Sequence, residues 1–222
     1  PDYVPSRTVR QSVLDGPIHP PKFLLLSNPS IPWGSEEIQR ISELEVPHIL
    51  RFIQSSRVHM SERDAHLFIA HKEAAVRMES LHNPVIASHI SADEYKHMLI
   101  HDPSDEVREQ YISTPLFPIP SDLVTQVFYN STPLEKLSLI SREGVHMSED
   151  MVENIIDHMD QDAIYAWARR PDVAWHPKME KLLRTHNVHI LDAIISKDGY
   201  IPDKDTMDKG LHSRVAPIRD IW

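Results

Sequence analysis

Two histidines, His97 and His101, are the side chains in this sequence with the clearest spacing for metal chemistry. Positions four residues apart share one face of a helix, and two imidazoles arranged in this way form half of a zinc site. A third ligand would have to come from elsewhere, with Asp102 or a neighbouring segment as the candidate. The alternative is that both histidines are polar residues on the exposed side of an amphipathic helix. We favour this alternative, and the sequence therefore predicts no metal and no cofactor.

A second group of side chains, Glu149, Glu153 and Asp157, recurs every four residues and forms an acidic stripe along one expected helix. No lysine or arginine occurs between Arg142 and Arg169. Such a stripe is ordinarily a solvated outer surface, and its functional alternative is a docking strip for a basic protein. The three carboxylates are therefore candidate partner-binding residues.

Motifs for catalysis are missing from the sequence. The chain has no cysteine, which excludes disulfides, thiol nucleophiles and cysteine-ligated clusters and is compatible with a reducing compartment. It also has no glycine-rich phosphate loop and no Gly-x-Ser-x-Gly elbow. Carboxylates are plentiful, but no pattern places two of them in an apolar pocket where their acidities would shift. We expect a non-enzymatic protein.

The charge balance narrows the class of partner. The chain carries 23 lysines and arginines against 33 aspartates and glutamates, a formal net charge of −10. An acidic chain is poorly suited to nucleic acid and to anionic membrane surfaces. No apolar run approaches the ~20 residues that span a bilayer, and no signal peptide is visible. We expect a cytoplasmic, acidic protein whose partner is another protein.

The elements that must position these side chains follow a repeating pattern. The segment Val-His-Met-Ser-Glu begins at Val58 and again at Val145, 87 residues apart, which is three times 29. Residues 91–115 are typical of one unit: Ser91 and Glu94 form a capping box for a first helix, and Pro103 separates it from a second helix. Equivalent starting positions recur at Ser35, Ser61, Ser91, Ser121, Ser148, Pro177 and Pro202.

A fixed period with helix breakers at a fixed phase indicates a helical repeat fold. The predicted fold is therefore all-α, an α-solenoid of about six to seven helical hairpins, in which each unit contacts its neighbours. Residues 1–22 show no clear periodicity and are expected to form an arm, and residues 23–222 form the repeat domain. The last unit would begin at Pro202 and end with the apolar residues Val215, Ile218, Ile221 and Trp222.

Several short motifs resemble the leucine-rich repeat variant family, a helical relative of HEAT repeats. They are Ser27-Asn28-Pro29, Val76-Arg77 with Asn83-Pro84, and Asp102 with Val107-Arg108, within a resemblance that covers residues 23–199. The later units carry Glu135 and Ile164 at the expected arginine position, so no continuous arginine ladder is predicted.

The resemblance implies a HEAT-like superhelix with a binding surface, and no particular reaction. An iron–sulfur cluster occurs beside the repeats of one family member, but a chain without cysteine cannot ligate it in that way. HEAT-like repeats also occur in alkylpurine DNA glycosylases, which leaves a HEAT-like nucleic-acid-binding protein or a DNA glycosylase-type enzyme as the alternative function. Such proteins need a basic groove, whereas this chain is acidic.

A candidate binding row follows from the second helices, which the resemblance places along the concave surface. Counting back from their expected ends puts five apolar residues in the core: Val76, Val107, Leu134, Ala163 and Ile190. The position two residues later points away from that stripe. The row that results is Met78, Glu109, Lys136, Tyr165 and Asp192. Its mixture of soft, charged and aromatic side chains suits protein recognition, with a solvated row as the alternative.

Overall fold

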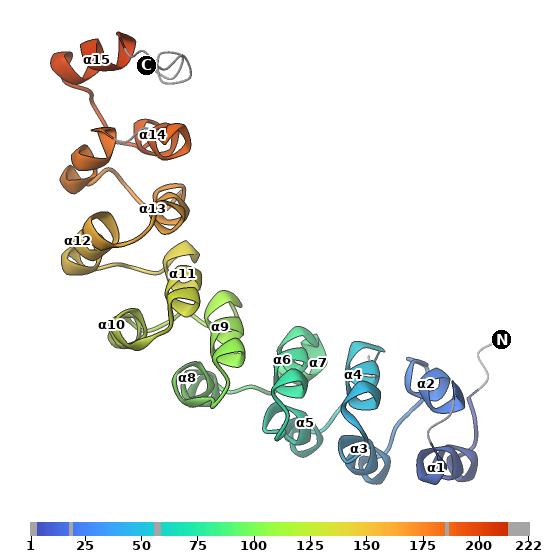
Figure 1. Cartoon of the computed structure of the whole chain (residues 1–222). Coiled ribbons are helices and arrows are strands. Elements are labelled where there is room, and N and C mark those ends of the chain that lie inside the picture. The colour runs from blue at the N-terminus through green and yellow to red at the C-terminus, as the bar shows by residue number, and fades with distance from the viewer. Residues whose placement is uncertain (1–3, 18–19, 56–58, 185–186, 213–222) are drawn as a thin grey trace. The chain divides into compact units, whose positions relative to one another are not determined.

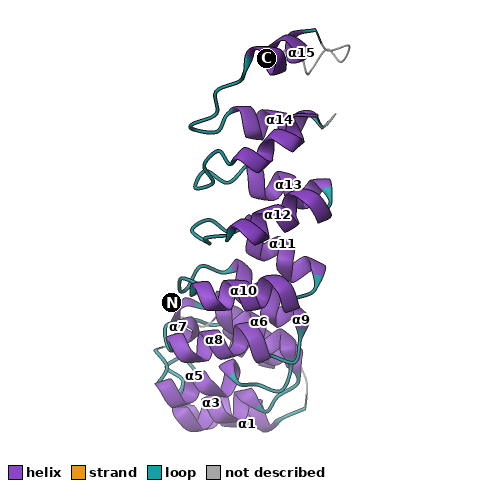
Figure 2. Ribbon diagram, turned by 90° about the vertical axis from the view of Figure 1, so that its left-hand side faces the viewer, coloured by secondary structure: helices purple, strands orange, loops and turns teal. Residues whose placement is uncertain are grey.

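The computed structural model describes residues 4–17, 20–55, 59–184 and 187–212, and it contains helices and no strands within these ranges (Figures 1 and 2). The contacts divide the chain into two compact units, Pro1–Tyr111 and Ile112–Trp222, which are described separately. The helices of the first unit are α1 (Arg7–Asp15), α2 (Pro20–Leu26), α3 (Ser35–Ser42), α4 (Val46–Ser55), α5 (Glu62–Ile69), α6 (Ala74–His82), α7 (Pro84–Ala87) and α8 (Ala92–His101).

The boundary between the units falls within helix α9 (Asp105–Ser113). The remaining helices belong to the second unit, and one of them, η1, is a 3₁₀ helix. They are α10 (Ser121–Asn130), α11 (Pro133–Ser141), α12 (Glu149–His158), α13 (Gln161–Ala168), η1 (Pro177–Arg184), α14 (Val188–Ile195) and α15 (Lys204–Leu211).

Within each unit, sequential helices pair and the pairs pack side by side in two layers. In the first unit α2, α4 and α6 pack in succession in one layer, and α1, α3 and α5 pack in succession in the other (Figure 1). In the second unit α11, α13 and α14 form one layer, while α12 packs against η1 in the other (Figure 1). Short helices such as these are marginal in isolation, so packing between neighbouring pairs must stabilise them.

Serine and threonine caps explain where several helices begin. Ser61, Ser91 and Ser148 are N-caps as predicted, and each hydroxyl accepts a hydrogen bond from a backbone amide in the first turn. The capping box of Ser91 and Glu94 is also present. Two cap predictions are wrong by one residue, because Ser35 and Ser121 are the first helical residues. The final helix α15 begins at Lys204, two residues after the predicted start.

The second helix of each pair buries its residues in a recurring register. Helices α4, α6 and α13 all bury their third, fourth, seventh and eighth residues. In α13 these are Ala163, Ile164, Trp167 and Ala168. The spacing places the four side chains on one face of the helix, which is the pattern of an amphipathic helix against a core.

The predicted burial of Leu134 is wrong. Leu134 is 59% exposed, whereas Glu135, the third residue of α11, is only 2% exposed. Glu135 closes a capping box with Thr132, which fixes the start of the helix at Pro133. The expected register took Leu139 as the last buried residue of α11. Ile140, the eighth residue of the helix, is also buried, so the register lies one residue later.

This shift changes the predicted binding row and the comparison of arginine positions. Two residues after Glu135 the chain carries Leu137, so the row in α11 passes through Leu137 and not through Lys136. Lys136 is instead the fourth residue of its helix, the position that Arg77 and Arg108 occupy in α6 and α9. The fourth residue of α11 is therefore a cation, as it is in α6 and α9. The expectation that Glu135 occupies this position is wrong.

The expected arm at residues 1–22 contains helical structure. Residues of α1 pack against α2 and α3, and the expected boundary at residue 23 lies inside α2. Helix α1 buries Arg10 and Leu14, and the buried Arg10 binds Glu37 of α3, with Nε 2.8 Å from Oε1. The apolar residues predicted to close the last unit, Val215, Ile218, Ile221 and Trp222, lie outside the described residues.

Polar side chains just beyond second helices satisfy the carbonyl groups of the preceding second helix. The last carbonyls of a helix lack intrahelical partners, so these donors stabilise neighbouring pairs against each other. Asn83 donates to Ile53 O at 2.6 Å, Arg142 to Ile112 O at 2.7 Å and Arg170 to Ile140 O at 3.1 Å.

Candidate partner-binding surface

The exposed face of the second helices in the second unit carries an aromatic and cationic cluster. Helix α13 packs against both α11 and α14 (Figure 1). The ring centres of Tyr165 and His189 lie 5.9 Å apart, and the guanidinium carbon of Arg169 lies 5.8 Å from the Tyr165 ring centre. We refer to Tyr165, Arg169 and His189 as the Tyr165 cluster.

The composition of the Tyr165 cluster suits recognition of a macromolecule. Tyrosine and arginine are enriched among the residues that dominate binding energy at protein interfaces. The tyrosine ring is half-buried, and its contacts with Arg169 and His189 hold it on the surface at little cost in conformational freedom. Leu134 of α11 adds an exposed apolar side chain to the same layer.

The structure distributes the predicted row over both units. Met78 of α6 and Glu109 of α9 lie in the first unit, where both are half-buried. In the second unit, Tyr165 lies in the cluster and Asp192 of α14 is exposed. Lys136 points toward the other layer, because its ammonium lies 4.9 Å from the ring centre of Phe128 in α10.

Sequence reasoning missed Arg169 and His189. Arg169 follows the last residue of α13, and His189 is the second residue of α14, so neither falls on the single row that was predicted. A sequence signal did exist, since an aromatic residue followed four positions later by arginine places both side chains on one helix face. The contact with His189 depends on packing between α13 and α14 and has no local signal.

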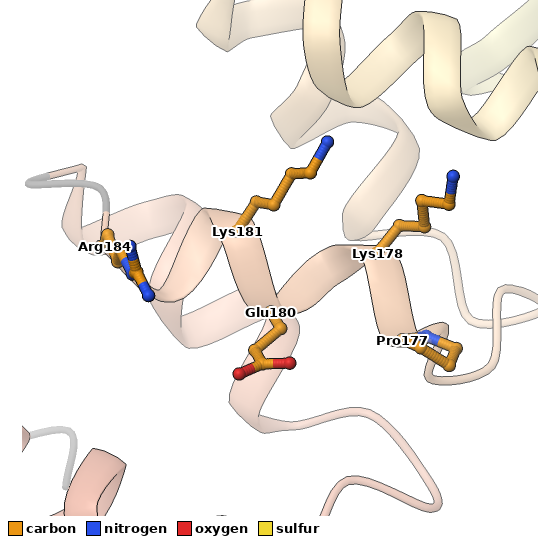
Figure 3. Close-up of a pocket in the computed structure, with 5 residues that line it drawn as sticks. All are labelled: Pro177, Lys178, Glu180, Lys181 and Arg184. Carbon is orange, nitrogen blue, oxygen red and sulfur yellow. The ribbon is translucent and has the colours of Figure 1, made fainter.

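The acidic stripe is covered in part by the chain's own lysines. Lys178 pairs with Glu153, and Lys181 Nζ lies 2.8 Å from Asp157 Oδ1. Figure 3 shows both lysines extending from η1 in the same direction, with Glu180 pointing away from them. They help to line an open pocket of about 590 Å³ with Pro177, Glu180 and Arg184 (Figure 3). The stripe is therefore largely neutralised, although Glu149 at its start remains exposed.

The two histidines with metal-ligand spacing lie on the surface. His97 and His101 are both exposed, and their ring centres are 5.1 Å apart. Asp102, the candidate third ligand, instead forms a buried ion pair with Arg77. Within the described ranges, no group of three or more histidine, cysteine, aspartate or glutamate side chains could hold a metal ion.

One histidine links two helices of the first unit through hydrogen bonds at both ring nitrogens. His66 Nδ1 lies 2.7 Å from the carbonyl oxygen of Glu62, and Nε2 lies 2.5 Å from Glu94 Oε1 in α8. Both partners are acceptors at neutral pH, so this geometry favours the protonated ring, in which both nitrogens donate. The hydrogen bond to the Glu62 carbonyl and the nearby Glu94 carboxylate raise the pKa of His66, against the opposing effect of burial.

We expect this link to make stability depend on pH. A group whose pKa is raised by folding adds stability below its unfolded pKa, and this stability is lost as pH rises through the folded value. His66→Gln should therefore lower the free energy of unfolding by about 0.5–1 kcal/mol near pH 6, because solvent screens a pair whose side chains are 32% and 35% exposed. The deficit should be smaller at about pH 9, because this stability is lost as the rising pH deprotonates the ring.

Urea denaturation at the two pH values measures this difference. The exposed His97 provides the control, since His97→Gln removes a histidine outside this link. An equal deficit for His66→Gln at both pH values would show that the ring is not protonated in the folded state.

Comparison of the chain with protein-family models, with curated proteins and with solved structures finds no match in any of the three. The resemblance to leucine-rich repeat variant units therefore remains a prediction from the residues. None of the helices in the described part of the chain is long and apolar enough to cross a membrane.

Proposed function

We propose that this chain is a non-enzymatic α-solenoid scaffold of HEAT-like helical hairpins that binds a protein partner through the exposed face of its second helices. The paired helices, their two layers within each unit and the recurring burial register support the repeat architecture. A chain without cysteine fits a reducing compartment such as the cytoplasm.

The observation that carries the binding proposal is the Tyr165 cluster. Tyr165 of α13 contacts both Arg169, which follows α13, and His189 of α14, and none of the three side chains is buried in the core. The negative net charge favours a protein over nucleic acid as the partner, because phosphate binding depends on an excess of lysine and arginine.

A pull-down with two matched variants tests this function. Tyr165→Ala combined with Arg169→Ala should reduce recovery of the partner at least about tenfold, since loss of such anchors typically costs more than 1 kcal/mol of binding energy. The control is Tyr129→Ala, which removes a 50% exposed tyrosine from α10 in the other layer. It should leave recovery unchanged.

Both variants should melt within a few degrees of the wild type, because the substituted side chains lie at the surface. Equal recovery by the double variant and the wild type would contradict the proposed surface. Sub-micromolar binding of the wild type to duplex DNA at physiological salt would favour the nucleic-acid alternative.

A further inference from the structure

The first unit buries a histidine, His48, in an environment that disfavours its charged form. His48 is the third residue of α4, and it is only 2% exposed. Its Nε2 is buried and forms no hydrogen bond with any residue that the structure describes. Buried polar atoms usually have a hydrogen-bond partner, because the loss of hydration is otherwise uncompensated. This nitrogen therefore calls for a physical explanation.

Helix α2 covers the imidazole of His48. The two helices α2 and α4 pack against each other in one layer (Figure 1). The ring centres of Phe23 in α2 and His48 lie 4.5 Å apart. Phe23 is itself 38% exposed, so this contact lies near the surface. Movement of α2 away from α4 can therefore admit water to the imidazole.

The same helix places a buried cation in this region. Lys22 of α2 is 5% exposed, and its ammonium donates to Leu14 O at 2.8 Å and to Gly16 O at 2.9 Å. These carbonyls belong to the end of α1. Both acceptors are uncharged, so the hydrogen bonds fix the ammonium in place without cancelling its positive charge.

The charges around α4 have opposing effects on the imidazole. Burial and the positive charge of Lys22 lower the pKa of His48, whereas the exposed Glu45, just before α4, raises it. The other helices packed against α4 are α3 and α6. Most of their charged groups, and Arg51 of α4 itself, have other partners: Glu36 binds Arg7, Glu37 binds Arg10, Arg40 binds Asp15, Arg77 binds Asp102, His82 contacts Gln110 and Arg51 donates to Ser27. Glu79 of α6 completes the set.

A proton added to His48 would be poorly accommodated while α2 stays in place. The charged ring would lie in the core with Lys22 nearby, and its Nε2–H would have no acceptor within the described part of the chain. Burial of a charge without a hydrogen-bonded partner is costly. Water can supply the missing hydrogen bond once the Phe23 ring moves away.

We propose that His48 is an acid-sensitive contact, which holds α2 against α4 while its ring is neutral and releases α2 when the ring is protonated. Helix α1 stays on α3, because the buried pair of Arg10 and Glu37 does not depend on the protonation of a histidine. This device is separate from the Tyr165 cluster, so either proposal can fail without the other.

The direction of the pH effect is opposite to that of His66. When folding lowers the pKa of a histidine, the closed form is fully stable above the ordinary pKa of about 6.5, and this stability is lost as pH falls below that value. The population with α2 released should rise by up to about tenfold for each pH unit. Because His66 stabilises the unit in acid, global unfolding would mix the two effects, and a local measurement is required.

Hydrogen–deuterium exchange of the full chain measures the release of α2 locally. After correction for the intrinsic effect of pH on exchange, the amides of α2 should exchange at least about threefold faster at pH 5 than at pH 7.5. His48→Phe keeps a ring in the site that cannot take up a proton, so exchange in α2 should no longer depend on pH. His97→Phe, at an exposed histidine of α8, is the matched control and should respond as the wild type does.

Nuclear magnetic resonance of the histidine rings measures the protonation itself. The ring signal that His48→Phe removes should titrate with a pKa below about 6.5. Glu45→Gln removes an exposed negative charge, so it should shift both this titration and the release of α2 to lower pH. Three results would overturn the proposal: a His48 pKa at or above about 6.5, α2 exchange in the wild type that does not depend on pH, or a pH dependence that persists in His48→Phe.

Discussion

Asp102→Ala is expected to lower the free energy of unfolding by about 3–5 kcal/mol, because it leaves a buried arginine without its counterion. Arg77 binds Asp102 through two hydrogen bonds of 2.7 Å, and both side chains are buried. Arg77 also donates to the carbonyl oxygens of His71 and Lys72, so it cannot turn toward solvent without breaking further hydrogen bonds. Urea denaturation at neutral pH measures the loss.

The matched control is Asp93→Ala in the same unit. Asp93 is 94% exposed at its side chain and lies 3.5 Å from Lys96, and removal of such a surface pair changes stability by about 0.5 kcal/mol or less. If Asp102→Ala cost no more than Asp93→Ala, the buried ion pair would not exist in solution.

The second large effect is expected from Leu139→Ala in α11, which should cost about 2–5 kcal/mol. Leu139 is fully buried, so truncation removes its contacts and leaves a cavity. Leu134→Ala in the same helix removes the same atoms from an exposed position and should change stability by about 0.5 kcal/mol or less.

This pair of variants tests the register of α11 directly. The sequence expectation placed both leucines in the core, whereas the structure exposes Leu134 and buries Glu135 instead. Comparable losses for Leu134→Ala and Leu139→Ala would restore the original register and would return Lys136 to the predicted binding row.

The local signals in the sequence predicted the class of structure well. Ser61, Ser91 and Ser148 mark helix starts that the sequence can predict. Each serine hydroxyl accepts a hydrogen bond from the backbone amide only three residues later, so the interaction is local. The buried residues Val76 and Ala163 follow from helical periodicity for the same reason. The register of α11 was less predictable, since two adjacent apolar residues near its end permitted two alignments.

Features that depend on contacts between distant residues could not be predicted. Helix α1 is held to α3 by the ion pair between Arg10 and Glu37, which are 27 residues apart in the sequence. Lys181 neutralises Asp157 only because η1 packs against α12.

The Tyr165 cluster has its origin in tertiary packing, because it joins α13 to α14. Its single residues are visible in the sequence, but their proximity is not.

Hydrogen–deuterium exchange of the chain with and without the partner recovered by the wild-type protein tests the proposed binding surface most directly. We predict that the partner slows amide exchange in α13 and α14, where the Tyr165 cluster lies, and leaves α10 and α12 unchanged. Protection of α10 and α12 without any change in α13 and α14 would contradict the account and place the binding surface on the opposite layer.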